Sequence, residues 1–405
     1  MARSLRHPRR FGVATRAASM ALGAGLALGG MLAMQWPLRG EAASATLALS
    51  NLGTTRVSGG VLWPSVGSAA LYIPSLGVTE SVRNAVVPIA SLTKMMTALV
   101  VLERLPLTPG EAGPCVTVSA SDYATYEYMK STDQSNVPVA IGESLCESQL
   151  LEGLLVHSAD NYAAMLANLV AGSQSGFVAL MNHRARELGL SQTTYADASG
   201  FDPASVSSAI DQARLANVLM SSPVARAIVA QPSVVLPVGG LESSYTPLVG
   251  THDVIGVKSG RTSQAGGCDV MAMSFARGST SDVLYAVVLG QRGGDLLGPA
   301  GEAALALAQS ALADVQHVRL ARGRVVGDVG WPGSRTPIVL AAPAEFWWWG
   351  RSSRVPVRIA LRRVVSALRA GERVGTLDVT GPVSGTFSLV ARGRAAPPTV
   401  WQRLR

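Results

Sequence analysis

The chain has 405 residues, of which 48% are hydrophobic and only 15% are charged. This is enough apolar sequence for two domains with their own cores, and it excludes an intrinsically disordered protein. Of the 34 basic residues, 31 are arginines, and lysine occurs only at positions 94, 130 and 258. A lysine-rich nucleic-acid-binding surface is therefore excluded, and no nucleic-acid partner is expected.

The charge divides the chain into three segments. Residues 1–45 carry six arginines and one acid, residues 46–315 have a net charge of −8, and residues 316–405 carry 15 arginines against four acids. We expect a leader over 1–45, an acidic main domain over 46–315 and a basic C-terminal domain over 316–405. The basic domain suits a membrane surface or an anionic wall polymer, although a solvated arginine-rich surface without a partner has the same composition.

The leader has the pattern of an export signal. Five arginines and no acid precede an uncharged apolar stretch over 17–38, and small residues follow at Ala42, Ala43 and Ala45. This pattern predicts an exported protein with a cleaved signal peptide. Because the apolar stretch is close to the ~20 residues that span a bilayer, a retained N-terminal membrane anchor is the alternative.

The elements expected downstream indicate a mixed α/β (α+β) fold. A strand is expected at 69–73, and from Ser91 onward five apolar residues recur on one face of a helix. Apolar β-branched runs separated by turn-rich segments predict an antiparallel sheet flanked by helices, and short strands beyond position 318 predict a small all-β domain. Lys130 lies in a polar stretch, 128–136, that we interpret as a loop. Further helices are expected at 150–156, 162–170, 177–188, 211–220 and 302–312, and the sheet strands at 253–258, 268–275 and 283–289.

Export makes disulfide formation possible for the three cysteines. Cys115 opens a strand-like run and Cys146 precedes a helix-like segment, so a bridge between them is expected if these runs pair as a hairpin. Three buried free thiols are the alternative, and Cys268 reads as a small core residue.

Two of the three lysines stand beside serines. Lys94 follows Ser91 by three residues, which is one helical turn, and Lys258 begins the sequence Lys-Ser-Gly at a strand end. Arginine cannot act as a base, whereas lysine can lose its proton when it is desolvated or lies near another cation. A third short motif, Ser158-Ala159-Asp160, lies between two predicted helices. Each motif alone is weak, because serine and aspartate also cap helices.

Together, and in this order, the three motifs resemble the signature of penicillin-binding proteins and class A β-lactamases. The chain from about 65 to 380 resembles the D-alanyl-D-alanine carboxypeptidases, the low-molecular-mass penicillin-binding proteins of peptidase family S11. This resemblance implies a penicillin-binding transpeptidase-like catalytic domain followed by the small β-domain of that family. The segments that carry it are PIASLTKMMTALVVLE, GESLCESQLLEGLLVHSADNYA, MNHRARELGLSQTTYADASGF, IGVKSGRTSQAGGCDVMA and RAGERVGTLDV.

The resemblance implies an acyl-enzyme mechanism. Ser91 would attack the carbonyl of the penultimate D-Ala, Lys94 would accept its proton, and Ser158 would relay the proton to the leaving amine. An ammonium from Lys258 at ~6 Å would favour neutral Lys94 by about 2–3 kcal/mol.

The resemblance also implies a carboxylate site. Lys258 and Ser259 would bind the terminal carboxylate, Gly260 would leave room for an added peptide strand, and the backbone N–H groups of Ser91 and Arg261 would form an oxyanion hole. The partners implied are peptidoglycan pentapeptide stems as substrates and β-lactams as covalent inhibitors, at the extracytoplasmic face of a bacterial envelope. No cofactor is implied, and Asp197, Asp202 and Asp253 lack the spacing of a metal site.

One departure affects the second motif, which in this family normally reads S-x-N. Asp160 stands at the third position, and Asn161 follows it. An ionised Asp160 cannot donate a hydrogen bond to a substrate carbonyl and would hold Lys94 protonated. Either Asn161 takes over through a shifted loop, or the enzyme is slower or differently selective.

Two other functions stay open at this stage. A wall-binding protein with a decayed site is consistent with Asp160 and the basic domain, and a β-lactam hydrolase would need a carboxylate such as Glu187 to activate water. His157 is interpreted as a loop or packing residue. The Trp347–Trp349 run is either a binding patch or, for at least one of its members, a product of alternating strand burial.

Overall fold

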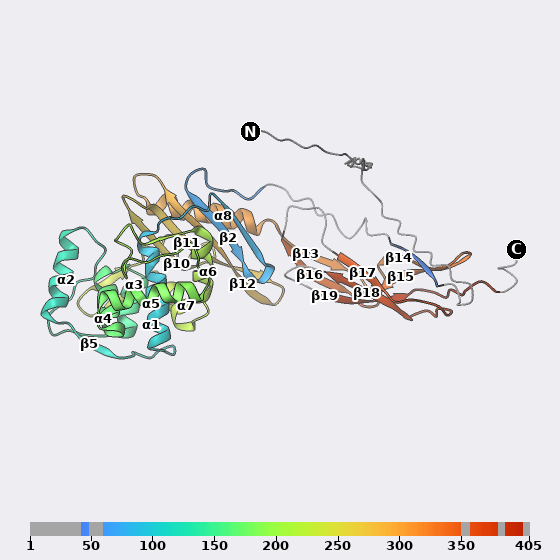
Figure 1. Cartoon of the computed structure of the whole chain (residues 1–405), viewed down its shortest axis with the longest axis horizontal. Helices are drawn as coiled ribbons and strands as arrows, with labels where there is room; N and C mark the ends of the chain where they lie inside the picture. Colours follow the sequence, from blue (N-terminus) through green and yellow to red (C-terminus); the bar gives the residue numbers. More distant parts are fainter. Residues whose placement is uncertain (1–41, 48–59, 350–356, 380–384, 400–405) are drawn as a thin grey trace, which may run out of the picture.

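The computed structural model describes residues 42–47, 60–349, 357–379 and 385–399. The predicted signal segment over 1–41 lies outside these residues. Figure 1 shows a larger domain of helices and strands and an elongated all-β domain, arranged end to end. Within the described ranges, no single helix is long and apolar enough to cross a membrane.

The larger domain is built on a five-stranded antiparallel sheet in the order β10-β11-β12-β2-β3. All four predicted strand segments lie within it, and tight hairpins connect β10 to β11 and β11 to β12. β10 forms one edge of the sheet. The strands are β2 (Ser68–Ile73), β3 (Val78–Val82), β10 (Val254–Thr262), β11 (Gly266–Arg277) and β12 (Thr280–Gln291).

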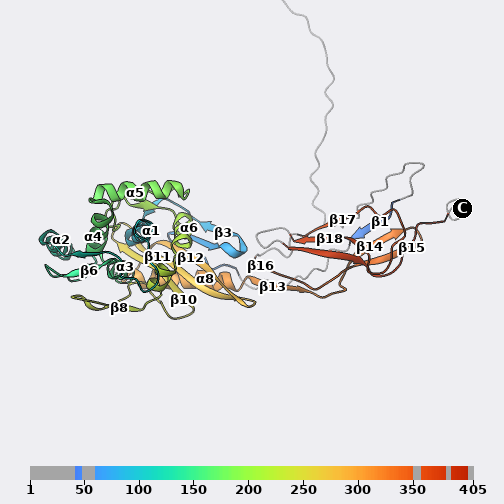
Figure 2. The same ribbon diagram turned by 90° about the horizontal axis from the view of Figure 1, so that it is seen from below.

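Helices cover both faces of this sheet, so the predicted fold class is confirmed. Val270 and Val287 pack toward α1 and α6, whereas Met271 and Val288 pack toward α8 on the opposite face. Figure 2 shows α5 and α8 on opposite sides of the domain. The helices are η1 (Pro74–Leu76), η2 (Ala90–Thr93), α1 (Lys94–Arg104), α2 (Ala120–Ser131), α3 (Glu147–Leu155), α4 (Asp160–Ala171), α5 (Gln174–Glu187), α6 (Ala209–Leu219), α7 (Pro223–Val229) and α8 (Leu297–Leu312).

The prediction that Lys130 lies in a loop was wrong, because this residue lies in the last turn of α2. Ser119 caps the helix: its Oγ accepts from the N–H of Asp122 at 3.1 Å, and its own N–H donates to the Asp122 carboxylate at 2.9 Å. This capping box satisfies two backbone groups at the helix start. The helix buries little apolar surface, so hydrophobic periodicity does not reveal it.

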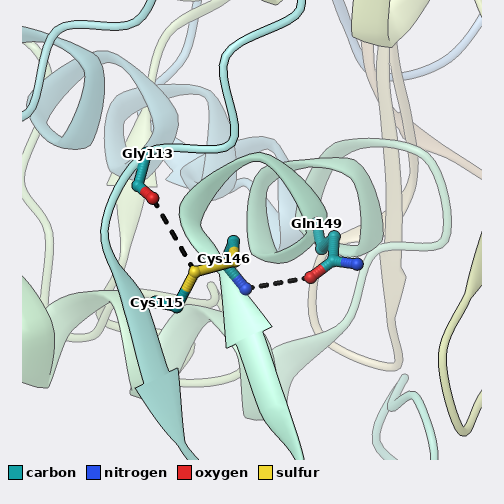
Figure 3. The surroundings of a disulfide bond; sticks show 4 residues. All are labelled: Gly113, Cys115, Cys146 and Gln149. Atoms are coloured by element: carbon teal, nitrogen blue, oxygen red, sulfur yellow. Dashed lines mark hydrogen bonds between the residues drawn. A yellow bond between two sulfur atoms is a disulfide. The ribbon is translucent and has the colours of Figure 1, made fainter.

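Three short antiparallel strand pairs complete the domain. β5 and β6 place Cys115 directly opposite Cys146, and the two residues form a disulfide (Figure 3), whereas Cys268 is a buried free thiol. Gln149 accepts the N–H of Cys146 at 2.9 Å and so caps α3 (Figure 3). The pairs are β4 (Val87–Pro88) with β7 (Val206–Ser207), β5 (Cys115–Thr117) with β6 (Ser144–Cys146), and β8 (Ser233–Leu236) with β9 (Gly240–Ser243).

The C-terminal domain contains a six-stranded antiparallel sheet in the order β1-β14-β15-β19-β18-β17, with a separate β13–β16 ribbon. Its core includes Trp331, Leu377 and Leu389. Trp349 is 9% exposed and its Nε1 donates to Ala311 O of α8, while Trp347 stacks on His317, so these two tryptophans have packing roles. The strands are β13 (Val315–Leu320), β14 (Val325–Trp331), β15 (Ser334–Leu340), β16 (Ala344–Trp349), β17 (Val357–Leu361), β18 (Arg373–Val379) and β19 (Gly385–Ala391).

The predicted domain boundary at residue 45 falls inside the first strand, β1 (Ser44–Leu47). It pairs with β14 and so belongs to the C-terminal sheet rather than to the leader or the main domain. Arg335 fixes it by donating to Ser44 Oγ at 2.8 Å. A strand pairing across nearly 300 residues leaves no local trace in the sequence.

This pairing predicts where the leader is removed, if it is removed. Cleavage after Ala45 would delete half of β1 and the bond from Ala43 N–H to Val364 O. We expect the exported protein to begin at or before Ala43, as N-terminal sequencing would show. A folded mature protein that begins at Thr46 would contradict the assignment of β1.

A second prediction concerns Glu147, which is completely buried at the start of α3 and has no hydrogen-bond partner for either carboxylate oxygen among the described residues. Burial raises the pKa of Glu147 from 4.5 to about 7. Its contribution to stability is therefore fully present below pH 4.5 and is lost as the pH rises through about 7. We expect Glu147→Gln to raise the free energy of unfolding at pH 8 by up to about 3 kcal/mol.

Urea denaturation of the oxidised protein at pH 5 and pH 8 measures this effect. The exposed Glu127→Gln on α2 is the control and should show no such difference between the two pH values. An equal effect of Glu147→Gln at both pH values would show that burial does not raise the pKa of Glu147 above its value in the unfolded chain.

Candidate active site

The first motif places a serine and a lysine in direct contact. Ser91 lies in the 3-10 turn η2, and Lys94 begins α1, so the predicted helix starts three residues later than its pattern indicates. Lys94 is completely buried, and its Nζ donates to Ser91 Oγ and to Ser199 O, both at 2.8 Å. A lysine at hydrogen-bond distance is positioned to take the serine proton.

Asp160 reaches the same ammonium from the first turn of α4. Its Oδ1 lies 2.5 Å from Lys94 Nζ, and both residues are buried. Burial raises the pKa of Asp160, and the Lys94 ammonium opposes this shift. At an effective dielectric of about 20, opposite charges at this distance attract by roughly 7 kcal/mol, whereas a second ammonium ~6 Å away repels by only about 3 kcal/mol.

The Lys94–Asp160 contact therefore occupies the lone pair that a base needs. If the shared proton resides on nitrogen, Lys94 is an ammonium; if it resides on oxygen, the carboxyl donates to the amine. In both states Lys94 and Asp160 share one proton, and this proton must leave before Lys94 can accept another. Because the two residues share it, its release is a property of the pair and cannot be assigned to one residue.

The structure does not support a shifted loop that would let Asn161 replace Asp160. The Asn161 amide accepts from Val137 N at 3.1 Å and donates to Val137 O at 2.9 Å, and the side chain is buried. Asn161 therefore holds the loop after α2 against α4 through its amide. Geometry assigns the third position of this motif to Asp160.

Ser158 lies in the turn between α3 and α4, at a position where the backbone is left-handed (φ 68°). It is 2% exposed. A non-glycine residue in this conformation is uncommon and needs support from its surroundings. The bonds from Ala159 N to Gly153 O and from Asp160 N to Ser135 O supply part of that support.

The third motif lies on the edge strand β10. Lys258 and Ser259 are buried; Lys258 Nζ donates to Ser259 O at 2.9 Å, and Ser259 Oγ donates to Tyr245 O at 2.7 Å. A Cβ on Gly260 would lie 2.6 Å from Ser91 N, so the glycine allows the strand to approach the serine turn. Arg261 follows and is exposed.

Lys258 and Lys94 act on each other across the site. Burial lowers the pKa of Lys258 well below its ordinary value, and the charge of Lys94 lowers it further, while Asp160 and Asp269 raise it. The first and third motifs are thus close enough for strong electrostatic coupling. The site contains cations that a bound carboxylate would stabilise.

No site role is expected from the sequence for the loop that follows Tyr195, although this loop lies in one of the segments that resemble the S11 carboxypeptidases. Ser199 supplies the carbonyl that binds Lys94, and Gly200, at φ 86°, lets the loop touch η2, since a Cβ there would lie 1.8 Å from Ala90 O. Asp197 organises the loop by accepting from Gly200 N, Phe201 N and Ser205 Oγ. In the sequence, only the D-x-S-G pattern that begins at Asp197 indicates a turn of this kind.

Asp269 was also missed, because it lies in a run that reads as an ordinary core strand. It is directly opposite Ser259 in the β10–β11 pair and is completely buried. Neither carboxylate oxygen has a hydrogen-bond partner among the described residues, and burial raises the pKa of Asp269 well above its ordinary value. The nearby Lys258 opposes this shift.

Glu187 does not enter this site. It ends α5, is 48% exposed, and pairs with His183 at 3.0 Å and Arg184 at 3.1 Å. A carboxylate that is paired with surface side chains is not placed to activate a water molecule at Ser91.

Fold and site together define a class: a serine nucleophile with a lysine one turn later, faced by a Lys-Ser-Gly edge strand, is the arrangement of penicillin-recognising acyl-transfer proteins. The model of the peptidase S11 family, D-alanyl-D-alanine carboxypeptidase, matches residues 78–293. The chain belongs to this family, which confirms the resemblance drawn from its motifs.

Individual similar proteins support this family assignment. The chain is 35% identical over 132 residues to the D-alanyl-D-alanine carboxypeptidase DacC of Escherichia coli, a match that covers 32% of this chain and 33% of that protein. It is 29% identical over 312 residues to DacD of the same organism, covering 72% and 75%. The chain thus spans about a third of the length of the first relative and three quarters of the second.

A solved structure confirms the fold over most of the chain. Penicillin-binding protein 5 from Haemophilus influenzae superposes with a TM-score of 0.58 at 22% identity, covering 84% of this chain and 99% of that one. A match at this level of identity supports the architecture, including the small β-domain. The function has to be argued from the residues of the site.

The Lys94–Asp160 pair leads to a prediction for Asp160→Asn. Asparagine carries no charge, so Lys94 would keep its contact with Ser91 Oγ and lose the ion pair that competes for it. We expect the rate of Ser91 acylation by labelled penicillin at pH 7 to rise at least about tenfold, which corresponds to about 1.4 kcal/mol.

The control is Asp253→Asn, which removes an exposed carboxylate outside the site. It should leave the acylation profile unchanged. An unchanged or slower Asp160→Asn protein would show that Asp160 supports catalysis rather than restraining it.

Proposed function

We propose that this protein is an exported serine-type D-Ala-D-Ala carboxypeptidase that removes the terminal D-Ala from peptidoglycan stem peptides. The observation that carries the proposal is the contact of 2.8 Å between Ser91 Oγ and Nζ of the buried Lys94. Membership of the D-alanyl-D-alanine carboxypeptidase family supports it.

In the first half of the proposed reaction, Ser91 Oγ attacks the carbonyl carbon of the penultimate D-Ala and its proton passes to Lys94. The backbone N–H groups of Ser91 and Arg261 bind the oxyanion. The bond to the terminal D-Ala breaks as its nitrogen takes a proton through Ser158, and a D-Ala ester of Ser91 remains. In the second half, water attacks this ester, gives its proton to Lys94, and releases the shortened peptide.

The terminal carboxylate of the peptide would bind at Lys258 and Ser259. Because Lys258 is buried and its pKa is lowered by burial and by Lys94, a bound carboxylate would stabilise its ammonium form. The same contacts would hold the carboxylate of a β-lactam, which acylates Ser91 and blocks the enzyme. Gly260 keeps the edge strand free of a side chain where an extended peptide would lie alongside it.

The basic C-terminal domain would keep the enzyme at an anionic surface of the envelope. Its 15 arginines against four acids give the segment 316–405 a net charge of +11, and Arg319 is 70% exposed. Attraction of this kind weakens as salt is added. Either lipid headgroups or anionic wall polymers supply suitable negative charge.

A second candidate function is a wall-binding protein with a weakened or lost activity. The specific observation in its favour is the Lys94–Asp160 ion pair, which holds a proton where the mechanism needs a free base. A β-lactam hydrolase is disfavoured, because Glu187 lies on the surface and cannot activate the deacylating water.

The test compares wild type and Ser91→Ala. We expect wild type to be covalently labelled by fluorescent penicillin and to release D-Ala from a pentapeptide, and Ser91→Ala to lose both activities. The circular dichroism of the two proteins should agree, because Ser91 contributes no core packing. Labelling that persists in Ser91→Ala would overturn the assignment of the nucleophile.

The same measurements separate the alternatives. Absence of both labelling and D-Ala release in wild type, across pH 6 to 10, would favour the wall-binding function. Rapid turnover of penicillin, with no stable label, would favour the hydrolase.

A further inference from the structure

Two glycines from distant parts of the chain meet at Ala90, the residue before the nucleophile. A Cβ on Gly260 of β10 would lie 3.2 Å from the Ala90 Cβ, and a Cβ on Gly200 would lie 1.8 Å from the Ala90 carbonyl oxygen. The edge strand and the loop of Gly200 therefore both touch the serine turn. The residues that follow these glycines, Phe201 and Arg261, lie beside this turn although they are far apart in the sequence.

Phe201 places an aromatic side chain on a fixed backbone at the edge of the site. The residue is 46% exposed. Its N–H donates to Asp197 Oδ2 at 2.9 Å, and the carbonyl of Ser199, two residues earlier, accepts from Lys94 Nζ at 2.8 Å. Moving this backbone away from the site would break these bonds. An exposed ring that is held in this way offers an apolar contact to a ligand at a low cost in entropy.

Arg261 carries an exposed positive charge in an acidic domain. The segment 46–315 has 13 basic against 21 acidic residues, yet Arg261 forms no ion pair within 4.0 Å among the described residues. Without a counter-charge of its own, its guanidinium can form the two parallel hydrogen bonds by which arginine recognises a carboxylate. Arg261 therefore offers a favourable contact to an anionic group that lies along this end of β10.

The path of the peptide brings one of its side chains to these two residues. In the proposed reaction the Arg261 N–H binds the oxyanion of the penultimate D-Ala, and Lys258 binds the terminal carboxylate. A peptide that adds to the edge of β10 advances about 3.3 Å per residue. The residue before D-Ala-D-Ala therefore lies at or just past Arg261, on the side away from Lys258. Its side chain comes within reach of the guanidinium, and the Phe201 ring lies beside the same turn.

We propose that Phe201 and Arg261 are specificity-determining residues that contact the amino acid before D-Ala-D-Ala and favour one whose aliphatic side chain ends in a carboxylate. The ring would pack against the methylene groups, and the guanidinium would pair with the carboxylate. A side chain that ends in an ammonium would instead be repelled by Arg261. This inference rests on the proposed function, because it takes the direction of the peptide from the positions assigned to Lys258 and the oxyanion hole.

The experiment varies this one side chain in peptides of the form acetyl-X-D-Ala-D-Ala. X is L-2-aminopimelate, L-lysine or L-norleucine, which share an unbranched carbon stem and end in a carboxylate, an ammonium or a methyl group, or it is glycine. Each kcat/KM for D-Ala release is divided by that of the glycine peptide with the same variant, so that general effects on the reaction cancel. We expect wild type to favour aminopimelate over lysine at least about fivefold, and norleucine over glycine by about the same factor.

The variants assign each preference to one residue. Arg261→Gln should reduce the aminopimelate-to-lysine ratio to about one, and Arg261→Lys, which keeps the charge but not the planar fork, should retain part of it. Phe201→Ala should remove most of the advantage of norleucine over glycine, and Phe201→Leu should restore part of it. The control Arg186→Gln removes an exposed arginine from the last turn of α5 and should leave both ratios as in wild type.

An aminopimelate-to-lysine ratio near one in wild type, or one that Arg261→Gln leaves unchanged, would overturn the inference while D-Ala release still supported the proposed function. A norleucine advantage that survives Phe201→Ala would overturn the assignment of Phe201. If wild type releases no D-Ala from any peptide, the proposed function fails, and equilibrium binding of the same peptides to Ser91→Ala tests the inference alone. Tighter binding of the aminopimelate peptide that is lost when Arg261→Gln is added would support it, and equal binding of all the peptides would overturn it.

Discussion

The buried pair of Lys94 and Asp160 is the interaction on which the site depends. It joins three separate parts of the chain: the serine turn with α1, the start of α4, and the loop that presents Ser199 O. A buried charge is tolerated when an opposite charge and hydrogen bonds surround it, and removing one partner is strongly destabilising. The geometry of Ser91 is therefore set by the buried charges of Lys94 and Asp160 and by the packing of the helices around them.

The second lysine extends this network across the sheet. Lys258 has no ion-pair partner within 4.0 Å in the described ranges, yet Asp160 and Asp269 both act on its charge. Asp269 has no hydrogen-bond partner among the described residues to compensate its burial, which favours its neutral form. Lys258 is thus left without a tight counter-charge in this part of the chain, and a bound carboxylate can supply one.

Much of the site could be predicted because short-range spacing determined it. Ser91 and Lys94 are one turn apart in any helical conformation, and antiparallel pairing of two strand-like runs brought Cys115 opposite Cys146. Long-range contacts made by the backbone could not be predicted. The carbonyls of Ser199 and Tyr245 come from segments without a motif, and a carbonyl oxygen carries no sequence signal. The pairing of β1 with β14 was hidden for the same reason.

The position of one proton decides between an active peptidase and a binding protein. An asparagine at 160 would leave Lys258 as the main charge acting on Lys94, and neutral Lys94 would follow from that repulsion. Asp160 instead favours the charged form of Lys94, because its attraction at 2.5 Å exceeds the repulsion from the more distant ammonium of Lys258. Acyl transfer at Ser91 needs a group that can take the serine proton, so a working enzyme must release Lys94 from this pair, whereas a binding protein needs no such release.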